Sequence, residues 1–305
     1  MKAIFIGECM VELSTLDNGL LQKSFAGDVF NSAVYMKRLV GDKCDVSLLT
    51  AIGEDSISHE MEVFFNHQGL STDTVFKTND GTVGLYLITT DDNGERSFSY
   101  WRDNSVARQM MDILAAKKIE ISELNSDLIF FTGISLGILT DASREILINQ
   151  LSTARKKGAK IAFDPNYRPQ LWETKEVAAK WIDKAYQVSD IIFPSFDEQQ
   201  LLFGTASIEK CLNHHPSEDE KEVVLKAGAD GMFVKYQHDI IHREFISADN
   251  VVDTTAAGDS FDGSYLAMRI LGHNVSDSLE KAAGVAAKVV TYPGAIIPEG
   301  LTREP

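Results

Sequence analysis

Short apolar runs alternate with amphipathic segments along most of the chain. Each run has the length of a buried strand, and each is followed by a segment in which apolar residues recur at helical spacing. This alternation predicts a mainly parallel sheet flanked by helices, and therefore the α/β class. The predicted strands span residues 3–7, 46–51, 127–132, 160–164, 190–193 and 222–226.

Two of the predicted helices carry clear local signals. Residues 143–157 are amphipathic, with Ile146, Leu147 and Leu151 recurring on one face. Thr174 is the predicted N-cap of another helix, because its hydroxyl can accept a hydrogen bond from a free backbone N–H group.

One region breaks this rhythm. Residues 83–90 and 95–101 are two β-rich runs joined by Asp-Asp-Asn-Gly at 91–94, which predicts an antiparallel hairpin. A hairpin inserted into a parallel α/β protein suggests a lid or a subunit contact. We find no linker and no internal repeat, so the sequence predicts a single domain over residues 1–305 with a β lid that includes roughly residues 81–102.

Charge limits the classes of partner. The formal net charge of −16 repels nucleic acid and anionic membrane surfaces, and no run of lysine and arginine offers an exception. An anionic small molecule would need arginines, helix N-termini or a cation close by. The three cysteines form no CxxC pair, and no apolar window has the length of a signal peptide or a membrane span, so we expect a cytoplasmic protein.

Residues 252–267 place small side chains directly before a segment with helical spacing. Ala256, Ala257 and Gly258 would let a ligand approach the backbone, where free N–H groups form an anion site. Asp259 would lie in the first helical turn, where its carboxylate could accept a proton from an attacking hydroxyl. The alternative is an Asp N-cap followed by small residues that only pack a helix against the sheet.

The same segment resembles the DTxGAGD signature of the ribokinase-like, or PfkB-type, carbohydrate kinases, with Ala256 in place of the usual glycine. The resemblance runs from Gly7 to Ala295. It implies a three-layer α/β sandwich with a mainly parallel central sheet and a small β lid. It also implies that Asp259 is the catalytic base, and that the N–H groups of Ala256, Ala257 and Gly258 form the anion hole.

Residues 25–31 resemble the GGxxxN sugar-binding motif of this family, with Ala26 replacing its first glycine. Gly27 permits close approach, and Asp28 and Asn31 can form hydrogen bonds with hydroxyl groups. Taken alone, the segment could equally be a turn that leads into a helix.

Two arginines follow predicted strands at the end where open α/β sheets bind ligands. Arg102 and Arg168 each carry a planar fork that matches a carboxylate, although either could instead form a surface ion pair. Their surroundings resemble the sugar-acid site of the 2-keto-3-deoxygluconate kinases in this family, with Tyr86 and Tyr100 contributing hydroxyl groups or stacking. The resemblance therefore implies ATP-dependent phosphorylation of 2-keto-3-deoxygluconate to 2-keto-3-deoxy-6-phosphogluconate. A fructokinase or ribokinase of the same fold is the alternative.

The nucleotide site must be of a type without a Walker P-loop or a GxGxxG fingerprint, since neither motif occurs. Residues 224–231 resemble the strand and glycine-rich turn with which the family contacts ATP, whereas a plain hairpin turn is the alternative. The implied nucleotide-binding residues are Asn166, Ser195, Lys226, Gly228, Gly231 and Gly258.

Glu198 is the candidate ligand for magnesium. Residues 195–198 occupy the place of the NxxE motif of the family, with Ser195 replacing asparagine, and Glu198 would act on Mg²⁺ through water. The family often also binds a monovalent cation near Asp253, Thr255 and the turn at 294–295. Lid pairing between subunits, again by resemblance, makes a homo-oligomer the expected assembly.

A competing activity comes from residues 133–137, a G-x-S-x-G match that directly follows a predicted strand, as in serine hydrolases. Ser135 would be the nucleophile. However, the next helix is expected to begin only near Thr140 or Asp141, and no HGGG-type oxyanion segment occurs. A sensor or scaffold with the same fold is also possible, but binding alone needs no base such as Asp259.

Overall fold

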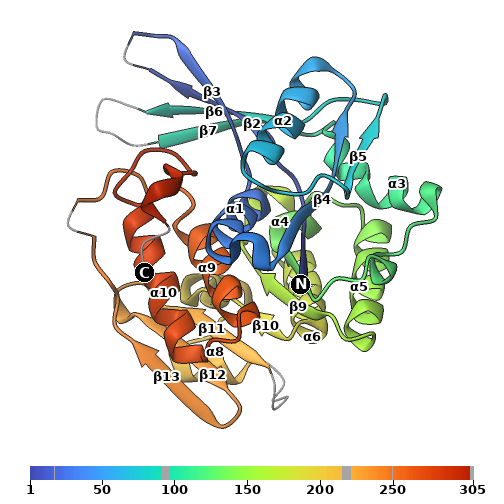
Figure 1. Cartoon of the computed structure of the whole chain (residues 1–305). Helices are drawn as coiled ribbons and strands as arrows, with labels where there is room; N and C mark the ends of the chain where they lie inside the picture. The colour runs from blue at the N-terminus through green and yellow to red at the C-terminus, as the bar shows by residue number, and fades with distance from the viewer. Residues whose placement is uncertain (17, 91–95, 215–220, 249, 303–305) are drawn as a thin grey trace.

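The computed structural model describes residues 1–16, 18–90, 96–214, 221–248 and 250–302. Its centre is a sheet in the order β13-β12-β11-β10-β9-β8-β1-β4-β5 (Figure 1), in which neighbouring strands are parallel except in the pairs β11–β12 and β12–β13, so that β12 runs against the other strands. The strands are β1 (Lys2–Ile6), β4 (Asp45–Gly53), β5 (Val75–Thr78), β8 (Leu128–Thr132), β9 (Lys160–Asp164), β10 (Ile191–Ile192), β11 (Glu222–Lys226), β12 (Met232–Tyr236) and β13 (Asp239–Arg243).

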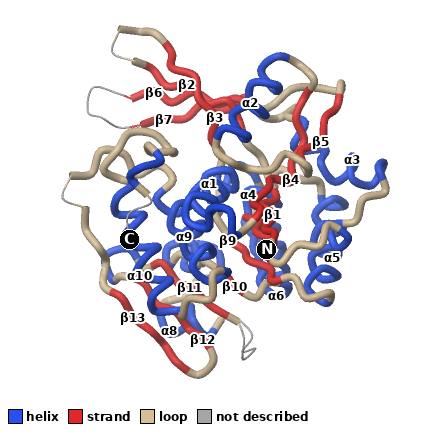
Figure 2. Tube along the Cα trace, in the orientation of Figure 1, coloured by secondary structure: helices blue, strands red, loops and turns tan. Residues whose placement is uncertain are grey.

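Helices cover both faces of this sheet (Figure 2). Residues of β1 alternate between the two faces: Ala3 and Phe5 belong to the core under one set of helices, while Ile4 and Ile6 belong to the core under the other. The first set is α1 (Asp28–Val40), α2 (Ser56–His67), α9 (Ala257–Ile270) and α10 (Val275–Val289). The second is α3 (Met110–Lys117), α4 (Gly133–Gly137), α5 (Asp141–Lys156), α6 (Lys175–Val188), α7 (Phe196–Phe203) and α8 (Ile208–Asn213).

A separate four-stranded sheet, called the small sheet below, projects beyond the layered body (Figure 1). Its order is β3-β2-β6-β7, with β2 parallel to β6 and the other pairs antiparallel. The strands are β2 (Met10–Thr15), β3 (Leu21–Ala26), β6 (Leu85–Thr90) and β7 (Arg96–Trp101). The predicted three-layer α/β sandwich with a mainly parallel sheet and a small β element is therefore confirmed.

Several local predictions need correction. Predicted strands 3–7 and 222–226 are not followed directly by helices, since β1 leads to β2 and β3, and β11 leads to β12. The helix predicted over 143–157 begins two residues earlier, because Thr140 caps it by accepting a bond from Ser143 N. Ile146 on this helix is 38% exposed, whereas Leu147 and Leu151 are buried.

Other local predictions are confirmed. Thr174 caps α6 by accepting a bond from Val177 N. The runs 83–90 and 95–101 correspond to the antiparallel pair β6 and β7, while the turn predicted at 91–94 lies outside the described residues. Within the described ranges, we find no helix that is both long enough and apolar enough to cross a bilayer.

Candidate active site

A cavity of about 830 Å³ lies between the small sheet and the large sheet, at the carboxyl ends of β8, β9 and β11. Most of the predicted site residues line it, although they come from segments that are far apart in the chain. They are Gly27, Asp28, Asn31, Tyr86, Tyr100, Arg102, Asn166, Arg168, Ser195, Glu198, Lys226 and residues 256–259.

The start of α9 forms part of the cavity wall. Ala256 is the N-cap and adopts a left-handed conformation with φ of 59°, and α9 begins at Ala257. Such a conformation costs a non-glycine residue roughly 1–2 kcal/mol, so the surrounding structure must hold it in place. Residues 256–259 line the cavity, so the N-terminus of α9, where helices bind anions, lies at its wall; Ala257 N also donates to the Thr254 carbonyl at 3.3 Å.

Asp259 lies in the first turn of α9 and faces α1, the helix that begins within the GGxxxN-like segment. Asn31, on α1, donates a hydrogen bond of 2.8 Å from Nδ2 to Oδ2 of Asp259. Burial, reinforced by the nearby charge of Asp28, raises the pKa of Asp259 from 3.8 to about 7. A carboxylate with that pKa can both hold and release a proton at neutral pH.

Asp28 connects three segments around the cavity. Its Oδ2 accepts hydrogen bonds from Thr132 Oγ1 at 2.6 Å and from Asn166 Nδ2 at 3.2 Å. Burial raises the pKa of Asp28 despite the bond from Thr132. Gly27 before it is required by space, since a Cβ there would overlap the carbonyl oxygen of Glu8. Sequence reasoning missed Thr132, whose only signal was its place at the end of a buried strand.

The two arginines differ in their surroundings. Arg102 is only 8% exposed and forms an ion pair with buried Glu8, whereas Arg168 is exposed and donates to the carbonyl of Tyr167 at 3.3 Å. Arg102 thus forms an ion pair, as the alternative interpretation had it, but inside the protein. Among the described residues, Arg102 Nε and Glu8 Oε1 have no hydrogen-bond partner. Sequence reasoning did not assign Glu8 to the site, although a charged residue directly after a buried strand was a signal.

Tyr86 and Tyr100 face each other on β6 and β7, with ring centroids 5.8 Å apart. The Tyr86 hydroxyl donates to Glu12, which also accepts a hydrogen bond from Ser24 at 2.8 Å. Burial and the Glu12 carboxylate together raise the pKa of Tyr86 far above its usual range. The Tyr86 hydroxyl is therefore fixed by the small sheet itself, which leaves its ring available for stacking.

Lys226 lies between two buried carboxylates, with Nζ 2.9 Å from Asp164 and 3.3 Å from Asp262. Burial would lower the pKa of Lys226, but these carboxylates hold it well above its usual range. Neither aspartate was predicted from the sequence. Asp164 is the last residue of β9 and lies two positions before the predicted site residue Asn166, which was a usable signal, whereas the inward direction of Asp262 is evident only in the folded helix.

Glu198 is positioned by its own helix and by the loop after β9. Ser195 caps α7 by accepting a bond from Glu198 N, and Glu198 Oε1 accepts a bond of 2.7 Å from Tyr167 N. Oε2 of Glu198 is buried and has no hydrogen-bond partner within the described ranges. Burial and the Asp164 charge raise the pKa of Glu198. Over the same ranges, no group of three or more His, Cys, Asp and Glu side chains could hold a metal.

Residues 2–300 match the family described as pfkB family carbohydrate kinase. The chain belongs to this family. A relative in Dickeya dadantii, named 2-dehydro-3-deoxygluconokinase, is 39% identical over 96% of both chains. A protein of the same name in Escherichia coli K12 is 36% identical over 97% of both. An E. coli protein solved in complex with ATP and Mg²⁺ has the same fold, with a TM-score of 0.81 at 22% identity over 96% of this chain and 94% of its own.

Three features predicted for this pfkB-family chain lie wholly or partly outside the cavity lining: the turn with Gly228 and Gly231, the cation site, of which Thr255 alone lines the cavity, and Ser135. Gly228 and Gly231 form the turn between β11 and β12, with φ of 55° and 85°. The segments of the predicted cation site do meet, because Asp253 accepts hydrogen bonds from Thr255 N at 2.9 Å and from Gly294 N at 2.7 Å.

The third is Ser135. The expectation that no helix begins before Thr140 is wrong, since α4 starts at Gly133. Ser135 is nevertheless buried, and its hydroxyl donates to the carbonyl of Ile6 at 2.6 Å while its N–H bonds to Thr132 Oγ1 in a capping box. In this kinase fold the serine secures a helix start and does not line the cavity.

Proposed function

We propose that this chain transfers the γ-phosphoryl group of ATP to the terminal hydroxyl of 2-keto-3-deoxygluconate, giving the 6-phosphate and ADP. The observation that carries the proposal is a single cavity with Asp259 and the N-terminus of α9 in its lining, together with two arginines, Arg102 and Arg168. Relatives named 2-dehydro-3-deoxygluconokinase, the same sugar acid under another name, support the choice of substrate.

Asp259 would act as the base. In its ionised form it accepts the proton of the attacking hydroxyl as the oxygen bonds to the phosphoryl group, while Asn31 fixes the direction of the carboxylate. The first N–H groups of α9 would stabilise the charge on the transferring group. Phosphoryl transfer depends mainly on such positioning and charge neutralisation.

The nucleotide side of the cavity would use Lys226 and Glu198. Lys226 Nζ pairs with Asp164 and Asp262, which leaves one of the three N–H donors of its ammonium group for a phosphate. Glu198 fits Mg²⁺, because its buried Oε2 lacks a partner among the described residues and one carboxylate with waters and phosphates is a common magnesium site. Bound Mg²⁺ would neutralise phosphate charge. A monovalent cation beside Asp253 stays a prediction.

The acid end of the sugar would contact Arg168 and Arg102. Arg168 presents an exposed guanidinium to the cavity, whereas Arg102 can offer only the donors that Glu8 leaves free. A fructokinase or ribokinase of the same fold would need neither arginine for a neutral sugar.

The proposal is tested by measuring ADP release from MgATP with 2-keto-3-deoxygluconate, fructose and ribose side by side. We expect kcat/KM for the sugar acid to exceed the others by about a hundredfold or more, since a site built for a carboxylate leaves its donors unpaired with a neutral sugar. Preference for a neutral sugar would contradict the substrate, and no turnover with any of them would contradict the activity.

Arg168→Met gives a second test, because it removes a guanidinium that is proposed to bind the carboxylate of the sugar acid. Loss of a charge-assisted hydrogen bond costs about 1.5 to 3 kcal/mol, which corresponds to a rise in KM for the sugar acid of roughly ten- to hundredfold. The KM for fructose, where turnover is measurable, serves as the internal control. An equal rise for both sugars would show that Arg168 does not contact the carboxylate.

A further inference from the structure

The G-x-S-x-G segment that forms α4 lies directly beneath the loop between β9 and α6. A Cβ at Gly133 would overlap the carbonyl oxygen of Pro165, and a Cβ at Gly137 would lie 3.0 Å from Cβ of Leu171. The loop is therefore packed against the bare backbone of α4. The segment from the last residue of β9 to Glu173, called the 164–173 loop below, carries Asn166 and Arg168. Its packing against α4 therefore determines where those two side chains enter the cavity.

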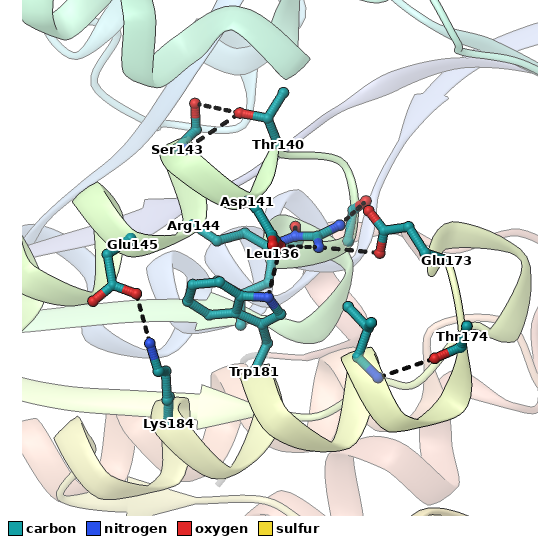
Figure 3. Close-up of polar contacts among 12 residues, drawn as sticks. Leu136, Thr140, Asp141, Ser143, Arg144, Glu145, Glu173, Thr174, Trp181 and Lys184 are labelled. Atoms are coloured by element: carbon teal, nitrogen blue, oxygen red, sulfur yellow. Dashed lines mark hydrogen bonds and ion pairs between the residues drawn. The ribbon is translucent and has the colours of Figure 1, made fainter.

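Arg144 on α5 fixes the C-terminal end of this loop against α4. Its guanidinium is 1% exposed and donates from Nε to the carbonyl of Leu136 at 3.0 Å, at the end of α4 (Figure 3). Nη1 lies 3.0 Å from Asp141 and 3.2 Å from Glu173. The same guanidinium stacks on the Trp172 ring, 4.8 Å from its centroid. One side chain thus joins α4, α5 and the last residues of the loop.

The first part of the loop is attached to the cavity itself. Asn166, which adopts a left-handed φ of 33°, donates to Asp28, and Tyr167 N donates to Glu198. Arg168 follows directly, exposed to the cavity, and among the described residues its side chain donates one hydrogen bond, to the Tyr167 carbonyl. Between Arg168 and Trp172 the chain forms a single turn of 3₁₀ helix, Pro169–Leu171. The direction of Arg168 therefore depends on both attachments of the loop.

We propose that Arg144 is a positioning residue for the sugar acid: it fixes the 164–173 loop on α4 and so directs Arg168 toward the substrate carboxylate. Arg144 itself does not line the cavity. The inference rests on the proposed function for its substrate, but the arrangement of the loop is independent of which sugar is phosphorylated.

The test compares Arg144→Lys with the matched control Glu145→Gln. Lysine keeps the charge but loses the planar fork and the stacking. Glu145 is the next residue on α5, is exposed, and forms an ion pair with half-buried Lys184, away from the loop (Figure 3). We expect Arg144→Lys to raise KM for the sugar acid about tenfold with little change in kcat or in KM for ATP, as a small displacement of a binding group does. The control should leave all three unchanged.

A double-mutant cycle separates positioning from general destabilisation. If Arg144 acts through Arg168, then Arg144→Lys should add little to the KM increase of Arg168→Met. A merely structural role would lower the melting temperature but leave KM of the folded enzyme at the wild-type value, and that result would overturn the proposal. Full additivity of the two KM effects would overturn it as well.

Hydrogen exchange of the free enzyme gives a readout that needs no substrate. Arg144→Lys should speed amide exchange across residues 164–173 relative to wild type and to Glu145→Gln. If wild type fails to phosphorylate the sugar acid, the proposed function is wrong while this measurement still tests Arg144. Unchanged exchange together with unchanged KM would refute the positioning role alone.

Discussion

Asp259 combines burial with a position at the start of a helix, and the two act on its proton in opposite directions. The helix N-terminus favours the carboxylate, but burial and the neighbouring Asp28 charge dominate and bring its pKa to about 7. We predict that Asp259→Asn lowers kcat by about a hundredfold or more, because asparagine can keep the contact with Asn31 but cannot accept the proton. Near-normal turnover would contradict the assigned role.

The same pKa predicts the pH dependence of activity. Below about pH 7 the Asp259 carboxyl is protonated and cannot act as a base, so kcat/KM should fall tenfold per pH unit on the acid side of that value. The profile is measured with ATP and Mg²⁺ saturating at each pH. A flat profile down to pH 5 would contradict a pKa of about 7 for Asp259.

Stability should respond to the same group. The folded-state pKa lies above the unfolded value, so the stability that wild type has below about pH 4 is lost as pH rises toward 7. An asparagine at position 259 cannot ionise, so the Asp259→Asn variant does not lose this stability as pH rises. The melting temperature of Asp259→Asn relative to wild type should therefore be more favourable at pH 8 than at pH 5, and the reverse order would contradict the raised pKa.

At the scale of elements, α4 shows how a short segment can position a site without lining it. Gly133→Ala should destabilise the fold by about 1 to 3 kcal/mol, because its Cβ would overlap the Pro165 carbonyl and displace the loop. Gly284→Ala in α10 is the matched control: nothing lies within 4 Å of its Cβ, so alanine should stabilise the helix by about 0.5 to 1 kcal/mol. Denaturant unfolding measures the change in the free energy of unfolding for both variants. Equal effects of the two substitutions would contradict the close packing of Gly133 against the Pro165 carbonyl.

The small sheet shows what element-level prediction could not reach. The hairpin of β6 and β7 was predictable from its two β-rich runs and polar turn, because its pairing is local. The other half was missed: β3 is largely polar and exposed, and β2 pairs with β6 in parallel across more than 70 residues of sequence, as in Val11 opposite Leu85. Such a pairing depends on where the rest of the fold delivers the strands.

At the scale of the whole molecule, the ligand cavity joins two bodies, since Tyr86, Tyr100 and Arg102 come from or adjoin the small sheet and Asp259 from the layered body. A ligand that bridges them stabilises the folded state by mass action, by about 2.7 kcal/mol at a hundred times its Kd. We predict a rise in melting temperature with 2-keto-3-deoxygluconate but not with an equal concentration of ribose. Asp259→Asn should show the same rise, because binding requires no base; equal shifts with both sugars would contradict the specificity.

The amino-acid sequence was enough to predict the class of fold, the helix start that carries Asp259, and the segments that carry Asn31, Arg168 and Lys226. These depend on local signals: apolar periodicity, small residues before a helix, and charged residues at strand ends. The partners of these residues became evident only in the folded protein: Glu8 pairs with Arg102, Asp262 pairs with Lys226, and Arg144 lies beneath the 164–173 loop. Each of these contacts joins residues that the chain separates and only the packed layers bring together, so no local pattern could specify them.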